Sequence, residues 1–217
     1  MKREADVLVI DVVLLPPEFI RDEAMRLNAL LNEREPTDNI HLGRVLNRPH
    51  ISLLMAGVHR EDLEPIGDAV QTVLQHFDPM LLTITGVYPY VNPSRTTITS
   101  FLIEKTAELQ SLHETVLSAL SPFMVLPLTK AMLSHPPGEG FSESILAYVN
   151  CFLDNSSFER YSPHITLGMG DLRTSDARIP IPGDIVVHTA AICRVGDHGV
   201  CSEVLATYEL GDAKESE

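Results

Sequence analysis

The sequence predicts an α+β fold with two pseudo-symmetric lobes, and two observations lead to this prediction. Segments typical of strands and of helices are mixed without the strict strand–helix–strand alternation of a doubly wound sheet. In addition, a seven-residue segment occurs twice, as PHISLLM at residues 49–55 and as PHITLGM at residues 163–169. Five of the seven positions are identical, and a sixth exchanges Ser for Thr. Because the copies lie about half the chain apart, they indicate an internal repeat.

The first half of the chain is predicted to contain four strands and two helices. Residues 6–14 are β-branched and apolar, so they predict a strand, which Pro16 and Pro17 end. A helix follows to about residue 32, and its buried side carries an apolar stripe of Ile20, Ala24, Leu27 and Leu31. The remaining elements are a strand at 48–57, a helix at 61–77, and strands at 80–90 and 96–104.

The second half begins with a predicted helix at 106–120, which Pro122 ends. Residues 122–141 are rich in Pro and Gly and predict a connection, an ordered loop or a lid. Further predicted elements are a helix at 142–154, a strand that begins at Pro163, and strands at 184–195 and 200–209 around a hairpin turn at 196–199. We expect one bilobal domain over residues 1–210, with motif-bearing halves of about 1–100 and 101–210, and a flexible tail at 211–217.

The charge balance limits the classes of partner. Sixteen Lys and Arg residues against thirty Asp and Glu residues give a net charge of −14. Binding to an extended duplex needs a dense set of cationic side chains, so this chain is not expected to bind one. A small anion or a nucleic-acid end, held by a few local donors, remains open. No membrane partner is expected, and we expect a monomer.

The cysteines and the N-terminus predict a cytoplasmic protein. Three cysteines, Cys151, Cys193 and Cys201, are an odd number in a chain long enough to fold without cross-links, which favours reduced thiols. The apolar segment near the N-terminus is interrupted by Asp11 and is followed by no small-residue cleavage site, so it does not predict a signal peptide. No segment reaches the roughly 18 to 20 apolar residues of a membrane span.

The repeat presents chemistry on one face of each strand. Because side chains alternate along a strand, His50 and Ser52 share a face, and His164 and Thr166 share the corresponding face of the second copy. The opposite faces are apolar and belong in a core. One neutral imidazole can accept a proton while a protonated one donates, and hydroxyl groups can hold phosphoryl oxygens. This arrangement requires no metal and no cofactor.

The paired PHISL and PHITL motifs resemble those of the two-histidine phosphoesterase superfamily, which includes RNA 2′,3′-cyclic phosphodiesterases and 2′-5′ RNA ligase-like proteins. The resemblance implies two lobes, each an antiparallel sheet with helices packed outside, and an active site in the cleft between them. It implies metal-independent hydrolysis of a nucleotide phosphodiester, which is sometimes reversible as ligation. Carried over to this chain, it makes His50 and His164 the acid/base pair and Ser52 and Thr166 the phosphate-binding residues.

Other motifs are interpreted as uninformative. A third His-x-Ser/Thr match, His113-Glu114-Thr115, lies on a predicted helix without the preceding Pro, so we regard it as chance. The remaining histidines lack zinc-ligand spacing, and Cys193 and Cys201 are too isolated for a zinc ribbon. The chain has no nucleophile elbow and no phosphate-binding loop sequence.

Candidate substrate contacts precede each copy of the motif. An Arg side chain can hold a phosphate and a Tyr ring can stack on a base, although each is equally typical of a solvated loop. These candidates are Arg44, Arg48, Arg160 and Tyr161.

The sequence therefore predicts a phosphodiesterase that acts on a 2′,3′-cyclic phosphate of a small nucleotide or an RNA end. Three alternatives stay open: 2′-5′ RNA ligation at the same site, a nucleotide-binding module without turnover, and a metal-dependent hydrolase that uses the additional histidines. The sequence does not determine which histidine is the acid, or the physiological substrate.

Overall fold

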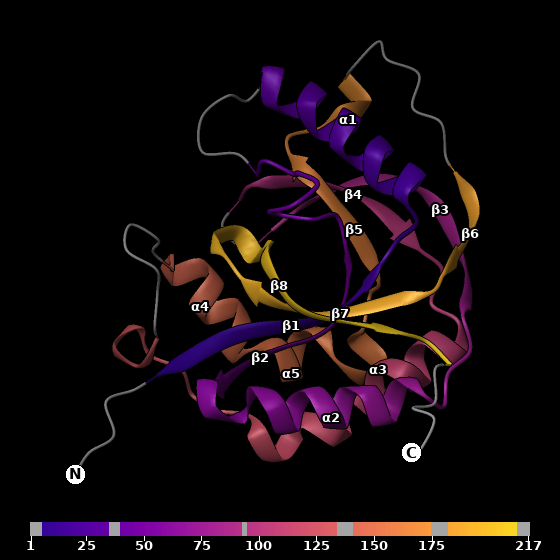
Figure 1. The fold of residues 1–217 in the computed structure, drawn as a ribbon. Coiled ribbons are helices and arrows are strands. Elements are labelled where there is room, and N and C mark those ends of the chain that lie inside the picture. Colours follow the sequence, from indigo (N-terminus) through magenta and orange to yellow (C-terminus); the bar gives the residue numbers. More distant parts are fainter. Residues whose placement is uncertain (1–5, 35–39, 93–94, 134–140, 175–181, 212–217) are drawn as a thin grey trace.

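Two four-stranded antiparallel sheets form the framework of the molecule (Figure 1). The computed structural model describes residues 6–34, 40–92, 95–133, 141–174 and 182–211. Sheet A has the strand order β2-β1-β7-β8 and consists of β1 (Val7–Leu15), β2 (Ile51–His59), β7 (Thr189–Val195) and β8 (Cys201–Glu209). Sheet B has the order β5-β4-β3-β6 and consists of β3 (Met80–Val91), β4 (Thr97–Ile103), β5 (His164–Met169) and β6 (Gly183–Val187). The predicted α+β class with two antiparallel lobes is confirmed.

The two sheets do not correspond to the two halves of the chain. Sheet A takes β1 and β2 from residues 1–100 and β7 and β8 from residues 101–210, and sheet B is mixed in the same way. This exchange makes β1 an inner strand of sheet A, between β2 and β7. It leaves both motif strands, β2 and β5, at the edge of their sheets.

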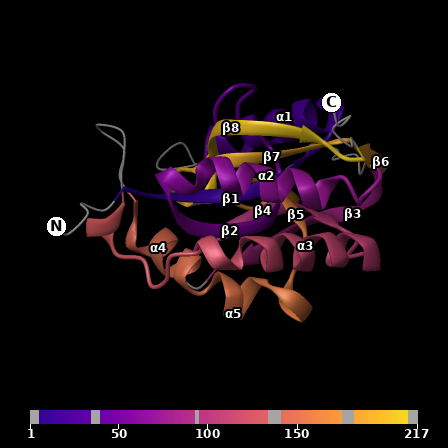
Figure 2. The ribbon, with the colours of Figure 1, turned by 60° about the horizontal axis from the view of Figure 1, so that its bottom comes forward.

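Helices cover the outer sides of the sheets. Helix α1 (Glu18–Arg34) lies along β5, and α2 (Leu63–Leu74) packs with α3 (Ala107–Leu120) against sheet A (Figures 1 and 2). The predicted apolar stripe of α1 is buried throughout. The helix predicted at 61–77 begins with a short 3₁₀ turn at Arg60–Asp62, and the one predicted at 142–154 is divided at Cys151 into α4 (Glu143–Asn150) and α5 (Phe152–Ser156).

The strand predicted at 184–195 is wrong as a single element. It is two strands, β6 and β7, which belong to different sheets. The chain leaves sheet B after Val187 and enters sheet A at Thr189, so that His188 lies at the crossing. No Gly or Pro marks this position, and apolar residues flank it on both sides, which is why the sequence pattern does not reveal the change of sheet.

The expectation of reduced thiols is wrong for two of the three cysteines. Cys193 and Cys201 form a disulfide across the β7–β8 hairpin, with their Cα atoms 5.3 Å apart. That separation lies within the range that a disulfide bridges. Cys151 is a free, exposed thiol. The disulfide removes one argument for the predicted cytoplasmic location, which stays a prediction, as does the monomeric state.

The proline-rich connection at 122–141 is ordered where it is described, and residues 134–140 lie outside the described part. The amide of Val125 donates to the carbonyl of Gly57 on β2 at 2.8 Å. A Cβ on Gly57 would lie 2.3 Å from the side chain of Leu128, so this glycine lets the connection pack directly on the strand. The predicted tail lies outside the described residues from 212 onward. Across the described ranges, no helix is long and apolar enough to cross a membrane.

Candidate active site

The two motif histidines lie at the beginnings of the two edge strands. His50 directly precedes β2, and His164 is the first residue of β5. Their apolar neighbours point into the core, as predicted, and Ile51, Leu53 and Ile165 are fully buried. Strands β2 and β5 contact each other although they belong to different sheets. The fold therefore brings together two motifs that are far apart in the sequence.

Both histidine rings are held in the same way. The Nδ1 atom of His50 lies 2.7 Å from the carbonyl oxygen of Arg48, and Nδ1 of His164 lies 2.8 Å from that of Ser162. A carbonyl oxygen only accepts, so each Nδ1 carries the hydrogen and donates it. In the neutral rings, each Nε2 is then the nitrogen with the lone pair. The repeat thus extends from sequence to tautomer.

The histidines are electrostatically coupled. Burial lowers the pKa of both His50 and His164 below the ordinary value of an imidazole. A positive charge on His164 lowers the pKa of His50 further. Two imidazoles within reach of each other are disfavoured from being protonated together, as a site with one acid and one base requires.

The two hydroxyl groups of the repeat have different surroundings. Ser52 donates to Oδ2 of Asp11 at a distance of 2.6 Å. Among the described residues, the hydroxyl of Thr166 has no hydrogen-bond partner. Thr166 lies opposite Ser100 on β4, whose own hydroxyl is buried without a partner. The second copy therefore offers free donors where the first copy offers an occupied one.

Asp11 is the residue of this site that the motif analysis missed. It lies in the middle of β1, is 1% exposed, and is the one acidic side chain that is buried in the described part of the chain. Its Oδ2 lies 3.6 Å from Nε2 of His50. Burial raises its pKa well above the ordinary carboxyl value, and the hydrogen bond from Ser52 opposes this shift. An acidic residue inside a nine-residue apolar strand is the signal by which the sequence could have identified it.

Tyr161 and His113 hold the first motif strand from outside. The Tyr161 hydroxyl donates to the carbonyl of Ser52 at 3.0 Å, and Nδ1 of His113 lies 2.6 Å from the carbonyl of Leu53. The two rings stack with their centroids 4.2 Å apart. Nε2 of His113 accepts a hydrogen bond from the amide of Phe158, so this imidazole is neutral. Burial lowers the pKa of His113 in the same direction. The third His-x-Thr match is therefore a structural contact and not part of the catalytic pair.

The remaining candidates lie in different surroundings. Arg44 is exposed and forms ion pairs with Glu18 and Asp22 of α1. Arg160 donates to the carbonyl of Asp154 at 2.5 Å. Tyr161 is buried, as described above, and its ring faces His113. Arg48 is partly buried, and its Nε atom is buried without a hydrogen-bond partner.

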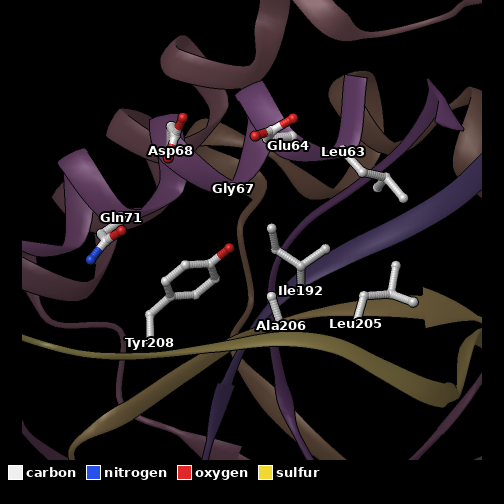
Figure 3. A pocket seen from close by; sticks show the side chains of 9 residues that line it. All are labelled: Leu63, Glu64, Gly67, Asp68, Gln71, Ile192, Leu205, Ala206 and Tyr208. Atoms are coloured by element: carbon white, nitrogen blue, oxygen red, sulfur yellow. The ribbon is translucent and has the colours of Figure 1, made fainter. Parts of the chain in front are cut away.

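A cavity of about 420 Å³ lies away from the histidines (Figure 3). It opens between α2 and sheet A and is lined by apolar side chains, with Glu64 and Asp68 above them. Val13 on β1 pairs with Ser52 on one side and with Ala191 on the other, so these three side chains lie on the same face of sheet A. Ile192, the next residue after Ala191, lines this cavity and therefore lies on the opposite face. The lining contains neither histidine nor cysteine. In the described ranges, no three His, Cys, Asp or Glu side chains are grouped to hold a metal ion.

Comparison with protein families identifies the chain. The model described as the 2′-5′ RNA ligase superfamily matches residues 43–180, which include both motifs. The chain belongs to this superfamily of two-histidine phosphoesterases. No curated protein matches the sequence.

Solved structures with the same fold cover almost the whole chain. E. coli LigT in complex with phosphate is 15% identical, with a TM-score of 0.54 over 95% of this chain and 99% of that chain. LigT in complex with 3′-AMP is 16% identical, with a TM-score of 0.54 over 95% and 100%. TT0787 of Thermus thermophilus is 17% identical, with a TM-score of 0.59 over 94% and 98%. At these identities the likeness establishes the fold.

The environment of the histidines predicts how they titrate. We expect ring NMR signals of His50 and His164 to give pKa values below about 6.5, the unperturbed value. We expect His164→Ala to raise the pKa of His50, because it removes a positive neighbour.

The lowered pKa values of the two histidines also predict how stability depends on pH. Since the folded-state values are lowered, stability is lost as the pH falls through about 6.5, where the unfolded chain takes up protons first. Urea unfolding at pH 7.5 and 5.5 measures this loss, and an unchanged His50 pKa in the variant would contradict the coupling.

Proposed function

We propose that this protein is a metal-independent phosphodiesterase that hydrolyses a 2′,3′-cyclic phosphate on a small nucleotide or at an RNA end. The observation that carries the proposal is the pair of imidazoles with matching tautomers, His50 and His164. Each Nδ1 is fixed by a backbone carbonyl. Each Nε2 is consequently the atom that exchanges a proton with substrate or water. The membership of the superfamily and the fold shared with E. coli LigT support this reading.

The proposed reaction needs only groups that the chain supplies. One imidazole accepts a proton from water while the water oxygen bonds to phosphorus. The opposite imidazolium donates its proton to the ribose oxygen whose bond to phosphorus breaks. The Thr166 hydroxyl donates to a non-bridging oxygen, where negative charge is held. Ser52 contributes in the same way once its hydroxyl no longer donates to Asp11. Thr166 is therefore the main hydroxyl donor to the phosphate when the substrate first binds.

Ligation at the same site is the second candidate. The family description names 2′-5′ RNA ligase, and E. coli LigT has been solved with phosphate and with 3′-AMP. Attack by a ribose hydroxyl in place of water on the cyclic phosphate would use the same acid and base. Product analysis with and without an RNA 5′-hydroxyl end distinguishes the two reactions.

Substitution of either histidine tests the proposal. We expect His50→Ala and His164→Ala each to lower kcat for uridine 2′,3′-cyclic phosphate about 10²- to 10⁴-fold, the contribution typical of a general acid or base. The assay contains a chelator, and Thr115→Ala, at the third His-x-Thr match, serves as the control that keeps activity. Wild-type turnover that requires added zinc or manganese would support the metal-dependent alternative, and tight nucleotide binding without turnover would support the binding module.

Arg48 is the substrate contact that we propose among the flanking residues. Together with Arg21 it lines a cavity of about 250 Å³, which Leu15, His188 and Thr189 also line. Leu14 pairs with Ile51, so Leu15 lies beside His50 in the continuing register. In the described part of this acidic chain, neither Arg21 nor Arg48 has a carboxylate partner. The hydroxyl of Thr189 already donates a hydrogen bond to Glu209. An anion in this cavity would therefore be held mainly by the guanidinium groups of Arg21 and Arg48.

This cavity predicts a preference for substrates with a second phosphate. We expect Arg48→Ala to raise KM for a cyclic-phosphate-ended dinucleotide about tenfold more than KM for the cyclic mononucleotide, as for the loss of a charge-assisted hydrogen bond. Arg26→Ala is the matched control, because Arg26 pairs with Glu23 on α1 and is not among the candidate substrate contacts. Equal changes in both KM values would contradict a phosphate contact at Arg48.

A further inference from the structure

The pseudo-symmetry of the site is broken by one carboxylate. Asp11 on β1 pairs with Met55 on β2, and Ile98 on β4 pairs with Met169 on β5. Met55 and Met169 are the same position of the repeat, and the register shift falls at the same place in both pairs of strands. Ile98 is therefore the counterpart of Asp11. The first copy has a carboxylic acid where the second has a hydrocarbon.

The contacts of Asp11 point to His50. Oδ2 receives the hydroxyl of Ser52 at 2.6 Å and lies 3.6 Å from Nε2 of His50. Oδ1 is buried and has no hydrogen-bond partner among the described residues. Tyr148 from α4 and Tyr161 from the segment before β5 are the other titratable groups that feel its charge. In the described part of the chain, His50 is the one basic side chain that lies within 4 Å of its carboxyl group.

A buried carboxylate is destabilising when one of its oxygen atoms has no hydrogen-bond partner, so the presence of Asp11 at this position needs an explanation. Burial disfavours the charged form of both groups: it raises the pKa of Asp11 and lowers that of His50. The two values move toward each other, so the pair can hold one proton between them. Burial favours the neutral form of both imidazoles, and the charge of His164 further opposes protonation of His50. Only His50 has a carboxylate beside it to counter this, because His164 has no such partner among the described residues.

We propose that Asp11 is a positioning residue that keeps the catalytic proton beside His50, so that His50 is the general acid and His164 is the general base. This assignment rests on the proposed phosphodiesterase function. Nε2 of His164 takes a proton from water as the water oxygen bonds to phosphorus. Nε2 of His50 gives its proton to the leaving ribose oxygen as the phosphorus–oxygen bond breaks. Proton exchange with solvent then restores both imidazoles.

Histidine titration tests the pair without substrate. Asp11→Asn keeps the size of the side chain and an acceptor for Ser52 but removes the charge. We expect the pKa of His50 to fall by about one unit or more, the effect of losing an opposite charge at this distance, and that of His164 to change less. Asp171→Asn is the matched control, because its carboxylate pairs with Arg173 at the surface. An unchanged His50 pKa in Asp11→Asn would overturn the proposal.

The leaving group separates the acid from the base. Uridine 2′,3′-cyclic phosphate expels a ribose oxygen that needs a proton, whereas thymidine 3′-(4-nitrophenyl phosphate) expels a nitrophenolate that does not. We expect Asp11→Asn and His50→Ala to lose at least about tenfold more activity on the cyclic phosphate than on the aryl ester. His164→Ala should lower the activity on the cyclic phosphate and on the aryl ester by the same factor. The opposite pattern, with His164→Ala spared on the aryl ester, would reverse the assignment.

Stability distinguishes this role from a structural one. A carboxyl group with a raised folded-state pKa costs stability as the pH rises above its unfolded value of about 3.9. Asp11→Asn should therefore melt at the same or a higher temperature than wild type at pH 7, while its activity falls. A large loss of stability would indicate a purely structural residue. Wild type that turns over neither substrate would refute the proposed function, and the His50 titration would still decide whether the pair exists.

Discussion

The active site depends on hydrogen bonds that side chains make to two edge strands. β2 and β5 carry the motifs, and each lies at the edge of its sheet, where outward backbone groups have no neighbouring strand. Tyr161 and His113 donate to carbonyls of β2, and Asn28 donates to the carbonyl of Leu167 on β5. A buried carbonyl left without a donor costs about 1–3 kcal/mol. These bonds thus satisfy carbonyl groups of the edge strands and at the same time hold the two motif strands in place.

The same contacts link the lobes. Tyr161 belongs to the chain that leads into β5 of sheet B, yet its hydroxyl is bound to β2 of sheet A. Asn28 lies on α1, which follows directly from β1 of sheet A, and it holds β5. Each motif strand is therefore held by a residue whose neighbours in the chain belong to the other sheet. The relative position of the two motif strands therefore depends on this reciprocal arrangement and not on the local sequence of either motif.

Patterns within a few residues predicted much of this structure. The repeat located His50 and His164, and alternation correctly assigned the faces of both strands, because these depend on local geometry alone. The break at His188, where β6 ends and β7 begins, could not be predicted, since no Gly or Pro interrupts the chain where it changes sheet. The disulfide was missed for a similar reason: the proximity of Cys193 and Cys201 is a property of hairpin register.

Asp11 shows where motif reasoning ends. Its role depends on a register that pairs β1 with β2 and on the absence of a carboxylate at Ile98, and neither fact is visible within the repeat. His113 is the converse case, because it matches the short motif but satisfies a carbonyl of β2 instead of reacting. Sequence similarity found the pair of imidazoles, whereas the surroundings decide how the two differ.

A double-variant cycle tests the central claim most directly, namely that His50 and His164 act on the same chemical step. Single-turnover rates on uridine 2′,3′-cyclic phosphate are compared for wild type, His50→Ala, His164→Ala and the double variant, all in the presence of chelator. Groups that act as a unit are strongly non-additive, so the double variant should be about as slow as the slower single variant. Losses that multiply would show that the histidines act independently and would contradict the paired mechanism.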